Sequence, residues 1–141
     1  METVLAMLAL FCVALLLGGM GFFAAVVAPL VFTRLPPPVA GPFIRQVFPV
    51  YYLWVGGLSA AAAVALLPLS VPAAAILAGS AAMSWWLRQV LMPRINALSD
   101  ASQRGDAQAG RAFHRMHRLS VIANALQLVA AAAVLAMFAL V

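Results

Sequence analysis

The sequence predicts an all-α integral membrane protein, an antiparallel bundle of four transmembrane helices. The chain is 67% hydrophobic and only 8% charged, with a mean hydropathy of +1.10, which is typical of membrane proteins and not of soluble domains. Its apolar residues also form runs of membrane-spanning length, separated by prolines and polar segments. A chain of 141 residues has room for four spans of about 20 residues with short connections. We therefore expect one domain, residues 1–141.

The four spans are expected near residues 3–32, 44–67, 72–92 and 117–140. Each must be helical, because lipid offers the backbone no hydrogen-bonding partner. The first apolar run is far longer than the core of a signal peptide, so we expect it to stay as a helix.

Prolines and polar residues mark the connections. A run of three prolines, residues 36–38, marks the first connection, and Pro68 and Pro72 bracket a very short second one, which makes spans two and three antiparallel. The third connection, about residues 93–116, is the only substantial polar segment. Asp106 within it is a candidate N-cap for an extension of the fourth helix.

The basic residues predict the orientation. All eight are arginines, against three acids and a net charge of +5, and they flank the first and third connections. Their places beside hydrophobic spans favour topology and anionic lipid headgroups over nucleic acid as the explanation. We expect both arginine-bearing connections to be cytoplasmic and both termini to be periplasmic.

Polar side chains follow one face of the fourth span. His117, Ser120, Asn124 and Gln127 fall at i, i+3, i+7 and i+10 within an arc of about 80°. If the hydrocarbon begins near Leu119, Asn124 lies roughly 7 Å and Gln127 roughly 12 Å inside it. Such groups must face protein, water or ligand. They serve either as structural hydrogen bonds between helices or as a ligand site.

Antiparallel threading brings the cytoplasmic ends of all spans to one depth, where other distinctive residues gather. We expect a polar, aromatic-rimmed pocket there that binds a small ligand, a lipid or a partner. Its candidate residues are His117, Ser120, Asn124, Gln127, Asn96, Arg88, Tyr51 and Trp85. The aromatic members also fit an interfacial belt.

Two further groups have alternative interpretations. Arg111, Arg115 and Arg118 form a basic stripe that we expect to contact anionic lipid headgroups, with a phosphate-bearing ligand as the alternative. His114 and His117 could ligate a metal or haem. No cofactor is predicted, because the chain has only two histidines and the single Cys12 belongs nearer the outer half of the membrane.

No common enzyme motif is present: the chain has no paired intramembrane carboxylates, phosphate loop or His-Glu-x-x-His. The favoured interpretation is a non-enzymatic protein whose pocket binds a ligand, lipid or partner in a transport or accessory role. The alternatives are a membrane oxidoreductase or oxygenase with a histidine-held cofactor, and a structural subunit of a membrane complex.

Small residues are dense on the spans and predict tight helix packing. They leave open whether the protein forms a homo-oligomer.

Short motifs along nearly the whole chain resemble the transmembrane-protein-205-like family. They comprise Gly21, Pro29, Phe32, Gly41, Phe48, Pro49, Tyr51, Asn96, Phe113, His117, Ser120 and Asn124. The resemblance implies a four-span membrane domain of unknown function, located in the inner membrane of a bacterium. Its eukaryotic members are associated with platinum-drug tolerance and vesicle membranes. The family pattern singles out Pro29, Phe48, Pro49, Asn96, His117, Ser120 and Asn124. These residues overlap the expected pocket, but the resemblance does not imply that any of them is catalytic.

Overall fold

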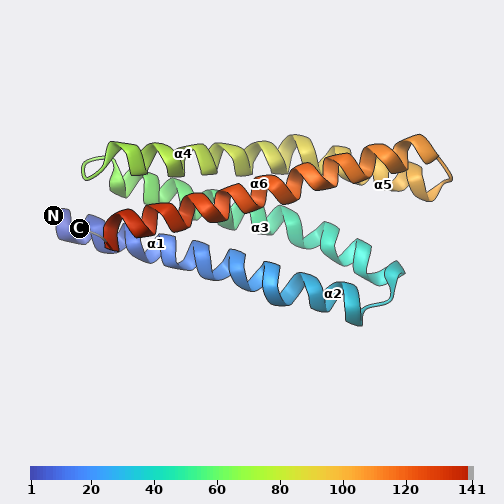
Figure 1. Cartoon of the computed structure of the whole chain (residues 1–141), viewed down its shortest axis with the longest axis horizontal. Helices are drawn as coiled ribbons and strands as arrows, with labels where there is room; N and C mark the ends of the chain where they lie inside the picture. Colours follow the sequence, from blue (N-terminus) through green and yellow to red (C-terminus); the bar gives the residue numbers. More distant parts are fainter. Residues whose placement is uncertain (140–141) are drawn as a thin grey trace.

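The computed structural model describes residues 1–139 as four long helical rods that run antiparallel (Figure 1). The rods are α1 (Glu2–Phe22) with the π-helical turn η1 (Phe23–Val27) and α2 (Ala28–Arg34); α3 (Pro37–Leu66); α4 (Val71–Trp86) with the π-helical turn η2 (Leu87–Leu91) and α5 (Met92–Gln103); and α6 (Ala107–Ala139). The two termini lie at one end, and the α2–α3 and α5–α6 connections lie at the other.

Prolines explain the two π-helical turns. Each turn ends two residues before a proline, η1 before Pro29 and η2 before Pro93. Proline has no N–H to donate, and its ring clashes with the carbonyl four residues earlier. The helix accommodates it by widening one turn: the N–H of Ala28 donates to the carbonyl of Phe23, five residues back. The first and third rods thus continue past their prolines.

The short connections agree with the sequence. The expected turn near residues 68–72 is confirmed, and Ser70 caps α4 by accepting a hydrogen bond from the N–H of Ala73 at 3.5 Å. Asp106 caps α6, because its Oδ1 accepts from the N–H groups of Gln108 and Ala109 at 2.9 and 3.0 Å. Gly105 supplies the positive φ of +96° that this turn requires.

The polar third connection is mostly helical. Of residues 93–116, only residues 104–106 lie outside a helix, and α6 begins directly after them, where the sequence predicts an extension of the fourth helix. The third rod continues past Pro93 in α5, which packs on the start of α6. The approach is close at Gly110, where an added Cβ would lie 3.0 Å from Ser102 Oγ. The polar residues of this segment therefore do not mark a long loop.

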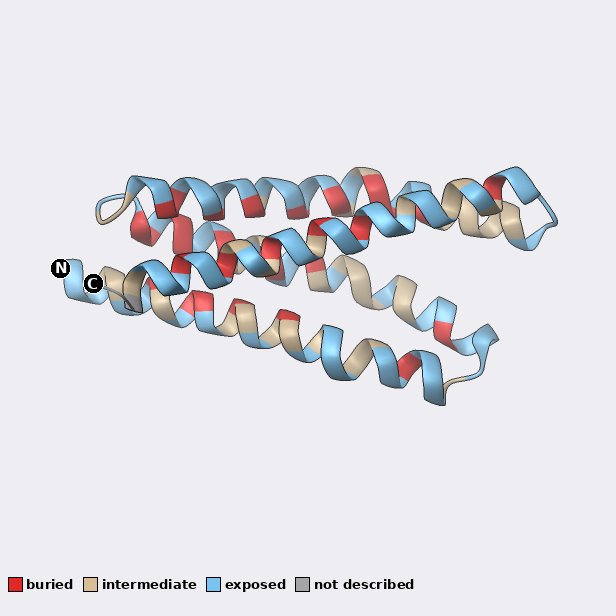
Figure 2. Ribbon diagram, viewed as in Figure 1, coloured by how far each residue is buried: buried red, intermediate tan, exposed pale blue. Residues whose placement is uncertain are grey.

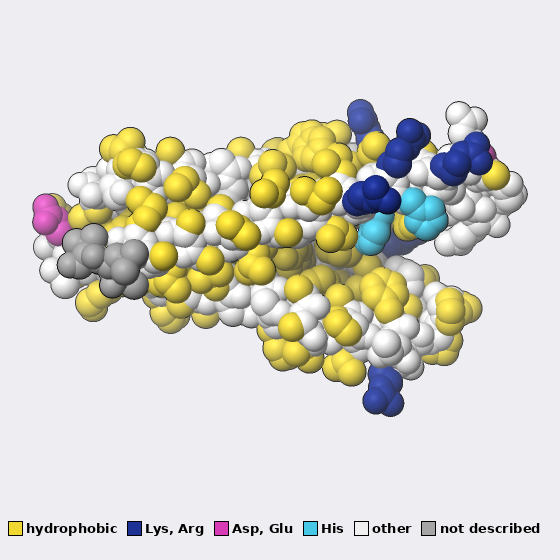
Figure 3. All heavy atoms as spheres, viewed as in Figure 1, with side chains coloured by type: hydrophobic (Ala, Val, Ile, Leu, Met, Phe, Trp, Pro, Cys, Tyr) yellow, Lys and Arg dark blue, Asp and Glu magenta, His cyan; other side chains and the backbone are white. Residues whose placement is uncertain are grey.

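Among the residues that the structure describes, three helical segments are long and apolar enough to cross a membrane: Glu2–Arg34, Pro37–Leu66 and Ala107–Phe138. The rod of α4 and α5 is not among them, since Ser80, Ser84 and Arg88 lower its hydropathy. Buried residues line the inner faces of the rods, while the outer faces are exposed and largely hydrophobic (Figures 2 and 3). A hydrophobic exterior around a packed interior is what lipid solvation requires.

Candidate functional site

A cavity of about 500 Å³ lies at the end of the bundle that carries the α2–α3 and α5–α6 connections. Toward this end, α2 and the start of α3 diverge from α5 and the start of α6 (Figure 1). Side chains from α1, η1, α2, α3, α5 and α6 line the cavity. Figure 3 shows the hollow between these two parts of the molecule. Its volume falls within the range of small-molecule sites, roughly 300–1,000 Å³.

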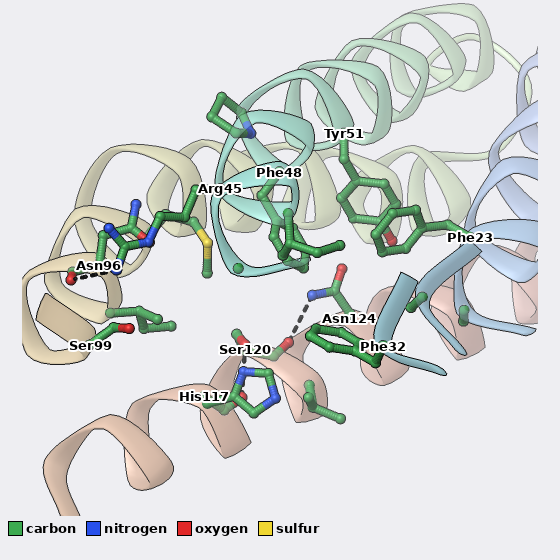
Figure 4. Close-up of a pocket in the computed structure, with 18 of the residues that line it drawn as sticks. Phe23, Phe32, Arg45, Phe48, Tyr51, Asn96, Ser99, His117, Ser120 and Asn124 are labelled. Carbon is green, nitrogen blue, oxygen red and sulfur yellow. Dashed lines mark hydrogen bonds between the residues drawn. The ribbon is translucent and has the colours of Figure 1, made fainter. Parts of the chain in front are cut away.

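Aromatic side chains form much of the wall at the deep end. The η1 turn presents Phe23 to α3, where its ring lies 4.8 Å from that of Tyr51 and 5.7 Å from that of Phe48. Phe48 in turn stacks on Tyr52 at 5.7 Å. Phe32 of α2 stands at the edge (Figure 4) and is 62% exposed. The π-helical turn therefore places an aromatic ring in the cavity wall.

Arg45 of α3 lies at the end of the cavity opposite the aromatic side chains. Its Nη2 lies 2.6 Å from Asp100 Oδ1 and donates to the backbone carbonyl of Asn96 at 3.4 Å, which joins α3 to α5. The hydrogen bond from Arg45 lowers the pKa of the Asp100 carboxyl below its ordinary value of 3.8. Ser99 also lines this end (Figure 4). The cavity is thus polar and cationic at one end and apolar at the other.

Asn124 of α6 stands between the two ends. Its Nδ2 donates to Tyr52 Oη at 2.9 Å and to the carbonyl of Ser120 at 2.8 Å. A carbonyl can only accept, so the amide nitrogen must face Ser120. Asn124 Oδ1 consequently has no partner among the described residues. Of the two roles expected for this face of the fourth span, Asn124 thus shows the hydrogen bond between helices.

Gln127 lies one turn further along α6 but outside this cavity. Its Nε2 donates to Ser84 Oγ at 2.7 Å and to the carbonyl of Ser80 at 2.9 Å. Ser59 Oγ of α3 donates to Ser80 Oγ at 3.3 Å, so the cluster joins α3, α4 and α6. Gln127 is 3% exposed and borders only a smaller hollow of about 140 Å³ between α4 and α6.

The structure brings together five of the eight expected pocket residues and places three elsewhere. Tyr51, Asn96, His117, Ser120 and Asn124 line the 500 Å³ cavity, whereas Gln127, Arg88 and Trp85 do not. Arg88 Nε instead donates to the carbonyl of Pro49 at 3.2 Å, and Trp85 is 61% exposed on the outside.

Arg45 was not among the residues expected to form the pocket. One signal in the sequence could have found it: Arg45, Phe48 and Tyr52 recur at i, i+3 and i+7, which places them on one face of α3. That spacing alone does not say which face of α3 meets the cavity.

The histidines stand at the rim. The ring of His117 stacks on Phe113 at 5.9 Å, and its backbone carbonyl accepts a 2.7 Å hydrogen bond from Ser120 Oγ. His114 is exposed. Within residues 1–139, no group of three or more His, Cys, Asp or Glu side chains could hold a metal ion. Arg111, Arg115 and Arg118 are all exposed on α6.

These features define a small helical membrane protein with a cavity at one end of its bundle. The chain belongs to the family described as a domain of unknown function, DUF4149, whose match covers residues 11–104. The match takes in most of the first rod and all of the second and third, and it ends before α6. No curated protein and no solved structure matches the chain.

Proposed function

We propose that this protein is a single four-span domain whose cavity binds a small ligand that arrives from the bilayer, in a transport or accessory role. The observation that carries this proposal is the cavity of about 500 Å³, polar at one end and apolar at the other. A site built only for packing would be filled, because protein interiors are close-packed.

The proposed fourth span is the part of the third rod from Val71 to Leu91. It lies beside α3 and α6 within the bundle, so a membrane that crosses those helices would surround it too. Its exposed side chains include Ile76, Met83, Trp85 and Trp86, which suit lipid and its interface. Its buried serines are satisfied inside the protein.

The proposed location is the inner membrane of a bacterium, with both termini periplasmic. All eight arginines flank the two connections at the cavity end, while Glu2 begins α1 beside the N-terminus at the other end (Figure 1). The positive-inside rule makes the arginine-bearing end cytoplasmic. The exposed stripe of Arg111, Arg115 and Arg118 is proposed to contact anionic headgroups there. We also propose that the chain belongs to the transmembrane-protein-205-like family. The motif residues Asn96, Ser120 and Asn124, which carry that resemblance, lie in the cavity wall.

Photolabelling of the whole protein tests ligand binding. The protein is placed in phosphatidylcholine nanodiscs with a long-chain alcohol that carries a diazirine on its chain, and the labelled peptides are mapped by mass spectrometry. Ala28→Trp fills the cavity, because Ala28 lines it. Ala25→Trp is the matched control, since Ala25 is exposed on the same rod and does not line the cavity.

We expect labelling of cavity-lining peptides from η1 and α6 that falls about tenfold in Ala28→Trp, equivalent to a loss of about 1.4 kcal/mol of binding, and that persists in Ala25→Trp. Equal labelling of the two variants and the native protein would show that the probe meets only the lipid-facing surface. That result would contradict the proposed site.

A further inference from the structure

We propose that the ligand of the cavity is an anionic amphiphile, an acyl chain with a carboxylate or phosphate head, whose head binds Arg45 and whose chain lies toward Phe23 and Leu128. This inference rests on the proposed function, since it names the chemistry of what that site takes. The shared chemistry is an anionic oxygen group on a hydrocarbon chain.

The charge of the lining selects an anionic head. Arg45 is the only Lys, Arg, Asp or Glu among the described residues that line the cavity. Both of its interactions with α5 use Nη2. A guanidinium has five N–H donors, so the donors on Nη1 and Nε remain for single hydrogen bonds to a carboxylate or phosphate. A bidentate contact would also use Nη2, which Asp100 occupies. A cationic head would meet Arg45 with no carboxylate in the lining to balance it.

The distribution of polar atoms selects a molecule with two unlike ends. Arg45, Asn96 and Ser99 gather on one side of the cavity, while Phe23 and Phe32 gather on the other (Figure 4). Along α3, the seven helical steps from Arg45 to Tyr52 span about 10 Å. The distal wall is apolar, formed by Met20, Ala24, Ala28 and Leu128 among others. A water-soluble anion would gain nothing from that wall, whereas an acyl chain is stabilised by it.

The opening of the cavity selects the bilayer as the source. The hollow is visible from the side of the bundle, between the lobe of α2 and the lobe of α5 and α6 (Figure 3). The exposed ring of Phe32 and the exposed side chain of Val121 flank it. In a membrane this side faces lipid. An amphiphile can therefore enter sideways with its head at the arginine-bearing end.

Asp100 competes with the ligand for the same arginine. The Arg45 and Asp100 side chains are 32% and 45% exposed, and an ion pair so accessible to water is worth little and exchanges readily. Removing the Asp100 charge frees the guanidinium, whereas removing Arg45 abolishes the contact. Two variants that break the same ion pair should thus have opposite effects on binding.

The experiment compares two diazirine probes with the same chain, a fatty acid and the matching alcohol, on the full chain in phosphatidylcholine nanodiscs at a pH where the acid is ionised. We expect the acid to label cavity-lining peptides about tenfold more than the alcohol, a difference of about 1.4 kcal/mol. Arg45→Gln should remove this difference and leave labelling by the alcohol intact, which also reports a preserved fold. Asp100→Asn should increase labelling by the acid, and unchanged labelling would contradict the competition between Asp100 and the ligand.

Competition identifies the source of the anion. Lysophosphatidic acid that displaces the acid probe more strongly than free fatty acid assigns the site to a phosphate head, and the reverse order assigns it to a carboxylate. Equal labelling by acid and alcohol, unchanged in Arg45→Gln, would overturn the proposal while the cavity still binds the alcohol. Absence of labelling with both probes would overturn the proposed function as well.

Discussion

Gln127 and Asn124 are amides one turn apart on the same face of α6, yet they have different surroundings. Gln127 is buried and joined to Ser80 and Ser84 of α4, while Asn124 bonds Tyr52 of α3 and borders the cavity. At the level of Gln127 the facing residues are small, and α3 and α4 close tightly around it. At the level of Asn124 the facing residues are aromatic and α2 diverges. The neighbours, and not the polar side chain, decide which amide is buried between helices and which lines the cavity.

The two π-helical turns repeat this contrast. Both arise from a proline two residues further along, but η2 buries Leu87 and Leu91 whereas η1 buries none of its residues. The third rod stays packed beyond η2 because α5 lies on α6. Beyond η1, α2 has only α3 as a substantial neighbour outside its own rod. A π-helical turn is thus followed by a packed segment, α5, in the third rod and by a diverging segment, α2, in the first rod.

Crowding the tight level should have the largest effect. A Cβ added at Gly56 would lie 3.2 Å from Ser84 Cβ, while none of the described atoms lies within 4 Å of a Cβ added at the neighbouring Gly57. Gly56→Leu should therefore push α3 from α4 and lower stability by about 1–3 kcal/mol. Gly57→Leu should change stability little. Thermal unfolding of both variants in the same detergent tests this, and equal melting temperatures would contradict the tight packing of α3 on α4.

Gln127→Leu should have the next largest effect on stability. It removes the donor that Ser84 Oγ and the Ser80 carbonyl accept from, at a cost of about 1–2 kcal/mol. Labelling of the 500 Å³ cavity should be unchanged, because Gln127 does not line it. Denaturation together with photolabelling measures both quantities. A selective loss of cavity labelling with stability unchanged would reverse the roles assigned to the two amides.

Asn124→Leu should show the converse behaviour. The substitution keeps approximate size and deletes the bond to Tyr52, so stability should fall by about 1 kcal/mol or less. The position of the label within the cavity should shift, because an apolar side chain replaces the polar Asn124 side chain that stands between the polar and apolar ends. Peptide mapping with the fatty-acid probe reports this shift. An unaltered labelling pattern would make Asn124 a structural residue like Gln127.

Tyr52→Phe separates the cross-helix bond from the polarity of Asn124 itself. Nδ2 keeps its contact with the Ser120 carbonyl, so we expect a loss of only about 0.5 kcal/mol. The measurement is the melting temperature beside that of Asn124→Leu. A larger loss than in Asn124→Leu would indicate that the Tyr52 hydroxyl has a further role.

The smallest expected effect is on the stability of the fold at acidic pH. The pKa of Asp100 is lowered in the folded protein by Arg45, so the ion pair stabilises the fold at pH values above the ordinary carboxyl value of 3.8. This contribution is lost as the pH falls through the lowered folded pKa. Asp100→Asn should lack this part of the pH dependence. The measurement is the melting temperature of the native protein and of Asp100→Asn as a function of pH. Two curves that stay parallel down to strongly acidic pH would contradict this contribution of the ion pair.

Hydropathy and local chemistry are enough to predict the helices, most of their ends and the interior position of one amide. Hydropathy runs locate helices because lipid leaves the backbone no other partners, and the α3–α4 turn and the Asp106 cap follow from local chemistry. The bond of Asn124 across helices follows from the cost of an amide in hydrocarbon.

The position of the cavity and the identity of the residues that reach it depend on the packing of the helices against one another. Periodicity places Gln127 and Asn124 on one face of α6, but the distance to the facing helix depends on the side chains that the two helices share at each level. Packing also brings Arg45 to Asp100, 55 positions away, and the third rod continues from η2 into α5 past Pro93 instead of ending there. These outcomes depend on how several helices pack at once, and a pattern read along one helix carries no information about that distance.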